Sequence, residues 1–556
     1  MGGCFLLLPF FLLLRPLPVP APCHTATRAE CKKHQKFIPG SQLVGEGVDI
    51  TTLRHTGFFP VDLNKYLRKD GTCTLCRNDH QGGDLQLLPL AVTDWRAEMT
   101  KCQRAVVKAM ARSAAEVATS AAKKIQNNWK ADLNVTPKPA VNVQVSVAGS
   151  HSREANFAAG KLQQDKYVFT SDTVECRYYR FRLIQMPPLE FEFKRALRFL
   201  PDKFTNSTQT EYFQLIANFG THFIRSVELG GRATDITALR TCKLTLDGVT
   251  ADEVADCLAV EAAVSVAFIG ETTAKSKWCK EKIKKHNLKG SFHETYNERH
   301  VDVVGGQHES IADLIFGATK KTQQFSAWMA TLPASPGLVT YSLDPLHFLL
   351  QKNDPRKEEL RQAVSEYIIQ KARWQNCTRP CPAGKVKSAH DPCRCVCHES
   401  WGMNEECCPK KWGLAKLQVR IIKASGLWGD YFTSTDAYVR VFFGGLEQRT
   451  PTIWNNNNPV WQTDIDFGPV QLNSGGPLRI QVWDADNGWD DDLLGTCDRA
   501  PHTEDSKIQD CYLNHGSVSF QYNVTCAPHL KGSTCLEYAH QGLLGKPVGN
   551  RSGAVW

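Results

Sequence analysis

The residues best suited to chemistry in this chain are aspartates gathered in two segments near its carboxyl end. Two lie in a first segment and five in a second: Asp430 and Asp436, then Asp484, Asp486, Asp490, Asp491 and Asp492. Carboxylates crowded in this way repel one another, so a fold tolerates them mainly by placing a cation among them. Calcium prefers about six to eight oxygen ligands, which makes it the natural guest. We therefore expect two or more calcium ions here, with the backbone carbonyl of Gly429 as a further ligand.

Bulky aromatic residues stand beside these acids at Trp428, Tyr431 and Trp489. Such rings favour a membrane interface, where one side chain contacts both lipid and water. Their Gly, Asp and Asn neighbours favour exposed loop positions over positions in a core. The alternative is a solvated acidic surface, which is the fate of most charge runs. Acids at regular spacing in two separate segments instead favour a surface that binds phospholipid once calcium has neutralised it.

The segment from Leu414 to about Cys511 is predicted to hold these loops, because apolar and polar residues alternate along it. The alternation is typical of strands with one buried face. It runs through Leu417, Val419 and Ile421, then Val439, Val441 and Phe443, then Leu478, Ile480 and Val482. Turn-forming clusters separate these runs. We expect an antiparallel β-sandwich with its loops gathered at the ends.

These features resemble a C2 domain, a β-sandwich family that binds calcium and phospholipid through apical loops. The family's first loop carries two aspartates six positions apart, and its third loop carries aspartates two and then six positions apart. The matching residues are Asp430 and Asp436, then Asp484, Asp486 and Asp492. The Asn-Pro-Val-Trp turn at 458–461 also resembles the family. The resemblance implies a calcium site in these loops.

The amino-terminal end of the chain predicts export. An apolar run from Met1 to Leu14 is followed by a proline-rich stretch ending at Ala21, which is typical of a signal peptide. No uninterrupted apolar run of about 18 residues follows it, so no transmembrane helix is predicted. Of 21 cysteines, one lies in the expected signal, and the remaining 20 suit ten disulfides. Glycosylation motifs agree with export, at Asn134, Asn206, Asn376, Asn523 and Asn550.

Seven cysteines fall between residues 376 and 408. This density predicts a small module that disulfides hold together, because so short a segment buries little core. Six of the cysteines suffice to close the module, and the seventh is expected to tie it to the preceding region. The spacing resembles an EGF-like module, and a zinc site is the alternative.

A short motif at 219–223 is the main family signal in the long region before this module. It reads Phe219, Gly220, Thr221, His222 and Phe223. It resembles the signature of the membrane attack complex/perforin (MACPF) family, with Phe219 in place of the usual Tyr or Trp. We interpret the motif as structural, because a lone histidine is more often a hydrogen-bonded structural residue than a catalyst.

Two segments of this region show patterns expected of concealed membrane hairpins. Lys101–Trp129 has a helical period, and a two-residue alternation follows it at 141–147. In the second segment we predict a strand at Val260–Phe268, a lysine-rich helix at Lys275–Lys289 and a strand at Phe292–Val303. Lipid accepts only helices or closed barrels, and barrel strands need only alternating residues. Refolding of about 40 residues near 101–140 would give arms of about 66 Å, enough to cross a hydrocarbon core of about 30 Å.

Two further features of the long region allow more than one interpretation. Two glycine pairs adjoin strand-like runs, Gly230 with Gly231 and Gly305 with Gly306. They are interpreted either as bend points of a sheet or as ordinary turns and bulges. The lysines between Lys275 and Lys289 are better read as a solvated helix face than as a nucleic-acid site. We expect no nucleic-acid partner.

The order of these parts predicts an α+β chain with a bent antiparallel sheet and helical clusters like those of the MACPF and cholesterol-dependent cytolysin folds. The expected bounds are a signal peptide at 1–21, a MACPF domain at 22–375, an EGF-like module at 376–410, a C2 domain at 411–515 and a disulfide-containing tail at 516–556. Within the family, the combination resembles the pore-forming effectors of cytotoxic lymphocytes.

That resemblance implies storage in acidic lytic granules and secretion from them, with calcium-dependent docking on phospholipid membranes of target cells. It also implies assembly into a ring-like homo-oligomer, with two β-hairpins per subunit inserted into a barrel at the plasma membrane or endosome, and passage of granule proteases as partners. A non-lytic MACPF/C2 membrane-adhesion protein is the alternative. We do not expect an enzyme, since the chain has neither a Gly-x-Ser-x-Gly nor a His-Glu-x-x-His motif.

Overall fold

A computed structural model gives the three-dimensional structure of the chain. It describes residues 23–97, 102–135, 143–265, 272–286, 288, 290–307, 322–376, 380–381, 384–389, 394–429, 431–486, 490–503 and 507–541. The expected signal peptide and three of the predicted site residues, Asp430, Trp489 and Asn550, lie outside these ranges. No helix within them is long and apolar enough to cross a membrane.

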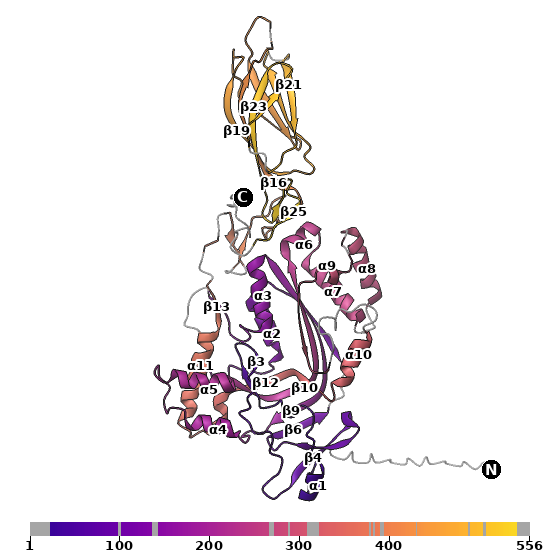
Figure 1. Ribbon diagram of the computed structural model, residues 1–556, viewed down its shortest axis with the longest axis vertical. Coiled ribbons are helices and arrows are strands. Elements are labelled where there is room, and N and C mark those ends of the chain that lie inside the picture. Colours follow the sequence, from indigo (N-terminus) through magenta and orange to yellow (C-terminus); the bar gives the residue numbers. More distant parts are fainter. Residues whose placement is uncertain are drawn as a thin grey trace, which may run out of the picture.

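The molecule is elongated, with a β-sandwich at one end and a broad mixed body at the other (Figure 1). A bent antiparallel sheet runs through the body. Its strands are β2 (Gly47–Asp49), β3 (Arg54–His55), β6 (Val92–Ala97), β7 (Gln103–Ala111), β9 (Tyr167–Leu183), β10 (His222–Arg240), β11 (Arg299–Val304) and β12 (Gly337–Pro345). The central pair is β9 and β10, which are paired from Arg182 opposite Ser226 to Tyr167 opposite Arg240, with one register shift between Leu229 and Gly230. The expected α+β class with a bent sheet is confirmed.

Helices cover the sheet in separate groups (Figure 1). We call β7, α2 (Ala114–Ala121) and η2 (Ala122–Lys124) the first cluster, and α7 (Ala251–Ser265), α8 (Thr272–Lys285) and α9 (Phe292–Thr295) the second cluster. The remaining helices of the body are α3 (Arg153–Gln164), α4 (Phe191–Arg198), α5 (Gln209–Phe219), α6 (Thr241–Asp247), α10 (Thr322–Thr331), η3 (Leu346–Leu349) and α11 (Arg356–Lys371). Strands β8 (Val143–Ser146) and β13 (Arg373–Asn376) pair beside α3.

The structure corrects two of the predicted elements. Residues 103–111, expected within a helix, form β7, which pairs with β9. Residues 260–265, expected in a strand, are the last part of helix α7. The lysine-rich helix is confirmed as α8, and β8 confirms the strand expected at 141–147 within the described residues. The last predicted strand divides into a short helix, α9, and β11.

A small sheet lies at the end of the body away from the sandwich (Figure 1). It contains β1 (Cys23–Ala26), β4 (Cys73–Asn78) and β5 (Asp84–Leu88), with α1 (Arg28–Lys33) and η1 (Asp79–Gln81) beside them. Disulfides Cys23–Cys76 and Cys31–Cys73 hold it together. These bonds compensate for its small apolar core, since short segments bury too little surface for stability.

The cysteine-rich module contains β14 (Val386–Lys387) and β15 (Cys395–Val396), and it carries disulfides Cys381–Cys395 and Cys397–Cys407. Its last cysteine, Cys408, bonds to Cys242 at the start of α6. The expectation that one cysteine ties the module to the preceding region is therefore confirmed.

The sandwich follows directly. One sheet contains β16 (Leu414–Ser425), β19 (Val460–Gln471), β22 (Gln509–Tyr512) and β23 (Ser517–Cys526). The other contains β17 (Ala437–Phe443), β18 (Leu446–Arg449), β20 (Leu478–Asp484) and β21 (Asp492–Arg499). Strand β23 pairs with β16 and carries the sandwich beyond residue 515. The chain then runs back toward the body through β24 (Leu530–Lys531) and β25 (Glu537–Tyr538).

Candidate membrane-docking loops and hinge region

The acidic loops meet at the free end of the sandwich, beyond β16, β17 and β20. Asp484, the last residue of β20, is 2% exposed, and its Oδ1 accepts a hydrogen bond from the backbone N–H of Asp436 at 2.7 Å. A Cβ at Gly429 would lie 1.8 Å from Asp484 Oδ2, so only glycine fits there. The structure thus brings the first and third loops together through Asp484.

The carboxylates of Asp436 and Asp491 are hydrogen-bonded around this point. Asp436 Oδ1 accepts from the backbone N–H of Asn455 at 2.6 Å. Asp491 accepts from the Asp486 N–H at 3.1 Å and from the Tyr438 hydroxyl at 2.6 Å. Burial, and then the neighbouring Asp491 carboxylate, raise the pKa of Tyr438 to about 12, so the phenol keeps its proton. Asp491 therefore connects the third loop to β17 through hydrogen bonds.

The donor set fits a hard cation. The loops offer carboxylate and backbone oxygens, which suit calcium, and lack the nitrogen and sulfur ligands that zinc prefers. Gly429 lies directly against the Asp484 carboxylate, so its backbone is close to the expected ligand oxygens. Among the described residues, which omit Asp430, no three acidic, His or Cys side chains converge closely enough to hold a metal. The part of Asp430 in the site stays a prediction.

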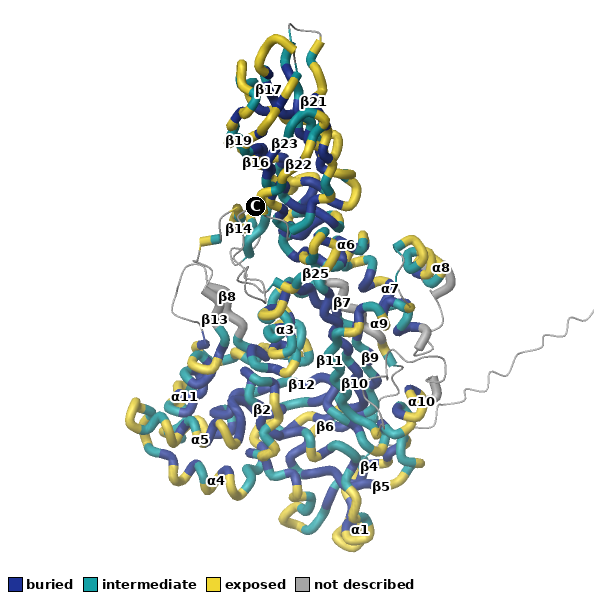
Figure 2. Tube along the Cα trace, turned by 45° about the horizontal axis from the view of Figure 1, so that its top comes forward, coloured by how far each residue is buried: buried dark blue, intermediate teal, exposed yellow. Residues whose placement is uncertain are grey.

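Exposed aromatic side chains stand beside the acids at this end. Trp428 is 46% exposed, Tyr431 is 84% exposed, and their ring centroids lie 5.3 Å apart. Phe432 is 100% exposed and was not predicted, although its position next to Tyr431 was a visible signal. Figure 2 shows exposed residues at this end of the sandwich. Fully exposed aromatic residues are costly in water, so they point to an apolar partner.

The residues of the signature motif hold the end of the first cluster. His222 is fully buried, and its Nε2 lies 2.9 Å from the carbonyl oxygen of Trp129, five residues after η2. Since a carbonyl can only accept, Nε2 carries the proton, and Nδ1 faces the Thr221 hydroxyl at 2.8 Å. Gly220 has a φ of 84°, and a Cβ there would lie 2.5 Å from the Val48 nitrogen. Phe219 and Phe223 are buried in the main core, which agrees with a structural motif.

The two glycine pairs, far apart in the sequence, meet where β10 passes from its pairing with β12 to its pairing with β11. A Cβ on Gly305 would lie 2.1 Å from the Gly230 carbonyl oxygen, and β10 shifts register at Gly230. Gly231 and Gly306 both face Trp328 of α10, whose indole nitrogen donates to the Gly305 carbonyl at 2.9 Å. The glycines permit a close backbone approach that other residues would block. Their role as hinges stays a prediction.

Three of the predicted glycosylation residues are exposed in the structure, namely Asn134, Asn206 and Asn523. Asn376 is the last residue of β13. An exposed amide is what carbohydrate attachment requires, so these sites stay predictions that the structure is compatible with.

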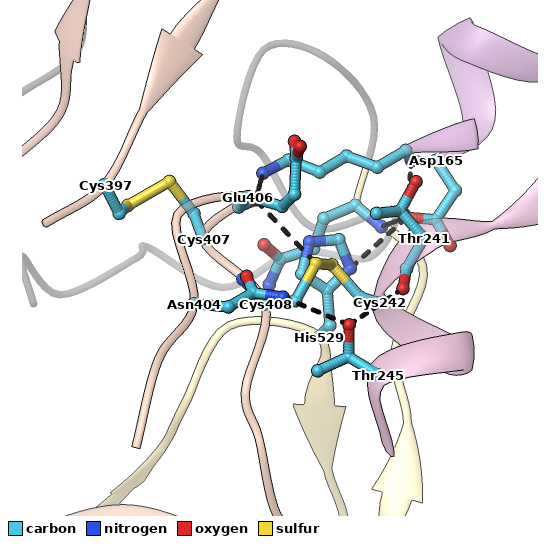
Figure 3. The surroundings of a disulfide bond; sticks show 12 residues. Asp165, Thr241, Cys242, Thr245, Cys397, Asn404, Glu406, Cys407, Cys408 and His529 are labelled. Atoms are coloured by element: carbon cyan, nitrogen blue, oxygen red, sulfur yellow. Dashed lines mark hydrogen bonds and ion pairs between the residues drawn. A yellow bond between two sulfur atoms is a disulfide. The ribbon is translucent and has the colours of Figure 1, made fainter. Parts of the chain in front are cut away.

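The body, the cysteine-rich module and the carboxyl-terminal segment meet at one junction (Figure 3). Beside the Cys242–Cys408 disulfide, Asn404 donates to the Thr245 hydroxyl at 3.1 Å, and the Lys166 amine bonds to the Glu406 carbonyl. Asp165 is fully buried and accepts from the Tyr538 hydroxyl at 2.8 Å. Its carboxylate also lies 3.2 Å from His529 Nδ1. These bonds couple the sandwich end of the molecule to the bent sheet.

Comparisons with known families agree with this architecture. The family model "MAC/Perforin domain" matches residues 35–377, "Perforin-1-like, EGF domain" matches 376–410 and "C2 domain" matches 415–512. The chain belongs to the MAC/Perforin family. The two described disulfides of the cysteine-rich module and the EGF match together favour an EGF-like module over the zinc alternative.

Individual relatives place the chain more closely within the family. It is similar to Perforin-1 of Homo sapiens, with 58% identity over 556 residues that cover all of both chains, and to Perforin-1 of Mus musculus, with 57% identity over the same span. It is 27% identical to Complement component C6 of Bos taurus over 224 residues, which are 39% of this chain and 23% of that protein.

Proposed function

We propose that this chain is a calcium-dependent, pore-forming cytolytic protein. The MAC/Perforin family is a pore-forming, non-enzymatic family, and the chain has its domains in the expected order. The sandwich docks on phospholipid through Trp428, Tyr431 and Phe432 once calcium neutralises the acids around Asp484. The body then inserts β-hairpins into the bilayer.

One observation carries the hairpin part of the proposal: a strand from each candidate segment is already paired with the central strands. In the first segment, β7 pairs with β9, with Gln103 opposite Glu175. In the second, β11 pairs with β10, with Arg299 opposite Thr237. Refolding of the helices between 101 and 140 and between 260 and 303 would therefore extend an existing register. No new sheet would have to nucleate, which lowers the entropic cost of insertion.

The rest of the proposal follows from barrel geometry and from the relatives. Two hairpins give four strands per subunit, so a closed, water-filled barrel requires a ring of many copies of this chain. Similarity to Perforin-1 supports secretion from cytotoxic granules and action on target-cell membranes at the surface or in endosomes. A pore of that size would admit granule proteases. The acidic loops need ionised carboxylates to bind calcium, so an acidic granule would keep the protein inactive.

Release of a dye from phospholipid vesicles tests this function. Full-length protein is expected to release dye with calcium and not with excess chelator, and imaging of the vesicles should show rings or arcs. Asp436→Ala should abolish calcium-triggered binding and release. Asp464→Ala is the matched control, because Asp464 is an exposed acid of the same domain, 3.6 Å from Arg420, and should behave as wild type.

The alternative is a protein that adheres to membranes without perforating them. It predicts calcium-dependent vesicle binding, equal sensitivity to Asp436→Ala and no dye release at any surface density. Dense coating without leakage would therefore overturn the pore and leave the docking surface intact.

A further inference from the structure

A cavity of about 720 Å³ separates the first cluster from the bent sheet. The cluster supplies Val117, Ser120 and Lys124 to its lining, and the central strands supply Phe169 and Arg232. Neither the docking loops nor the proposed hairpin register explains this space. The side chains around a cavity of this size lack packing partners on one side, so the cavity suggests a ligand.

The lining is divided by polarity. Val117, Phe169 and Ile236 belong to one buried apolar cluster that borders the cavity. Farther along the sheet the wall is hydroxyl-rich, and the side chains of Thr173 and Thr234 bond to each other at 3.2 Å. A ligand complementary to such a wall has an apolar body and a polar head.

Of the four cationic residues that line the cavity, Arg232 and Lys124 matter most for its polar part. Arg232 is 7% exposed, donates to the Val339 carbonyl at 2.8 Å, and lies 3.6 Å from Asp302. Lys124 lies close enough to Arg232 for the two charges to repel each other. The wall also carries Glu116, Glu154 and Glu175, and Glu175 is paired with Arg177 at 3.0 Å. The carboxylates of Glu154 and Asp302 attract the Lys124 charge, but among the described residues neither forms an ion pair with its amine within 4.0 Å. A partly buried cation without a close counter-ion is unfavourable, and an anion beside it would relieve that cost.

We propose that this cavity is a binding site for an amphipathic organic anion, with its carboxylate against Lys124 and Arg232 and its apolar body against Val117, Phe169 and Ile236. The cavity volume lies within the range of about 300–1,000 Å³ that is usual for small-molecule sites. Such a ligand bridges the first cluster and the central strands. The ligand binds only while the first cluster lies on the sheet. It therefore stabilises this arrangement, which we call the closed state, against refolding of the cluster into a hairpin. The stabilisation of the closed state rests on the proposed function, whereas the binding of the ligand does not.

Binding is tested on the full-length protein without calcium or vesicles, with a dansyl-labelled fatty carboxylate as the probe. We expect saturable binding of one probe per chain, and at least about tenfold weaker binding of the methyl ester. Lys124→Glu should weaken binding at least about tenfold by reversing the charge at the polar head. Lys130→Glu is the control, since Lys130 is exposed on the same segment and lies outside the cavity lining.

A second variant keeps the test valid if Lys124→Glu does not fold. Ser120→Trp places a large ring in the cavity from α2 and should weaken binding by a similar factor without a change of charge. Absence of saturable binding, or equal affinity in wild type, Lys124→Glu and Ser120→Trp, would overturn the site.

The effect on the closed state is measured separately. Saturating probe should raise several-fold the protein concentration needed for half-maximal vesicle leakage, and Lys124→Glu should remove that protection. Leakage unchanged by bound probe would overturn the stabilising role. A protein that binds the probe and never leaks would instead overturn the proposed pore and leave the site standing.

Discussion

The two helical clusters face the same bent sheet, but they are held in place by different means. The first is fixed mainly at its ends, by the Cys102–Cys176 disulfide before β7 and by the bond from His222 to the Trp129 carbonyl after η2. Between these points a cavity lies beneath it. Release of this segment therefore requires one end to loosen, and it also breaks the packing of Val117 on α3.

The second cluster is held from within. Val254, Leu258 and Ala262 of α7 are buried in a core of their own, and Cys257–Cys279 joins α7 to α8. Glu261 of α7 also accepts hydrogen bonds from the backbone at the start of α9. Release of the second cluster requires these internal contacts to break. We therefore expect that the two hairpins need not form at the same moment.

The two clusters also differ in their response to acid. Burial lowers the pKa of His222 to about 4, below its ordinary value of 6.5. The neutral imidazole therefore contributes stability that is complete above pH 6.5 and is lost as the pH falls toward 4. Acid weakens the anchor of the first cluster, whereas a buried aspartate beside the second cluster responds in the opposite direction.

Locking the first cluster should have the largest effect. Val117 of α2 and Ala158 of α3 belong to one buried apolar cluster, so Val117→Cys with Ala158→Cys offers a disulfide between them. The oxidised variant should bind vesicles with calcium as wild type does and release no dye, because β7 cannot be extended. Each single cysteine variant is the control. Wild-type leakage by the oxidised pair would show that the first cluster does not refold.

Opening the second cluster should have a smaller effect of opposite sign. Cys257–Cys279 closes a loop with a sequence separation of 22, which is worth about 3 kcal/mol in chain entropy. It also restrains the segment expected to extend. Cys257→Ser with Cys279→Ser should increase the leakage rate about fivefold at equal vesicle binding, and should lower the melting temperature. Cys526→Ser with Cys535→Ser, which opens a loop outside the cluster, should leave the rate unchanged. Equal leakage rates in the two double variants would show that the Cys257–Cys279 disulfide does not restrain the segment that refolds.

The contrast between the clusters was only partly predictable from the sequence. The C2 domain and the signature motif were recognisable because their information is local, in the spacing of acids and in five adjacent residues. The cluster elements were harder, since runs of Ala and Val suit both helix and strand. Residues 103–111 form a strand because β9 is available to pair with them, and residues 260–265 stay helical because α7 packs on its own core.

Contacts between residues far apart in the sequence could not be predicted from local sequence patterns. Gly230 and Gly305 were predicted separately, and only the fold shows that their backbones lie against each other. The same holds for His222 and Trp129, and for the cavity, whose walls come from α2 and from strands β9 and β10. Pattern analysis identifies which residues are unusual, and tertiary packing decides which of them meet.

The smallest expected effect concerns Asp235, which lies on β10 opposite Asp172 of β9, against α7. Burial raises its pKa to about 7, opposed by Arg299 at 3.8 Å and by the Thr237 hydroxyl, while the Asp172 charge adds to the rise. The folded state therefore holds a proton that the unfolded state releases near pH 3.8, so stability falls as the pH rises from about 4 to about 7.

Asp235→Asn removes this titration. It should raise the melting temperature by a few degrees at pH 8 and change it little at pH 5, and it should slow leakage slightly at neutral pH. Thr234→Val, a neutral change at the adjacent residue of β10, is the control and should leave the pH dependence as in wild type. A melting curve whose pH dependence is identical in wild type and Asp235→Asn would show that this carboxylate does not set the acid response of the second cluster. The opposite responses of the two clusters would then reduce to His222 alone.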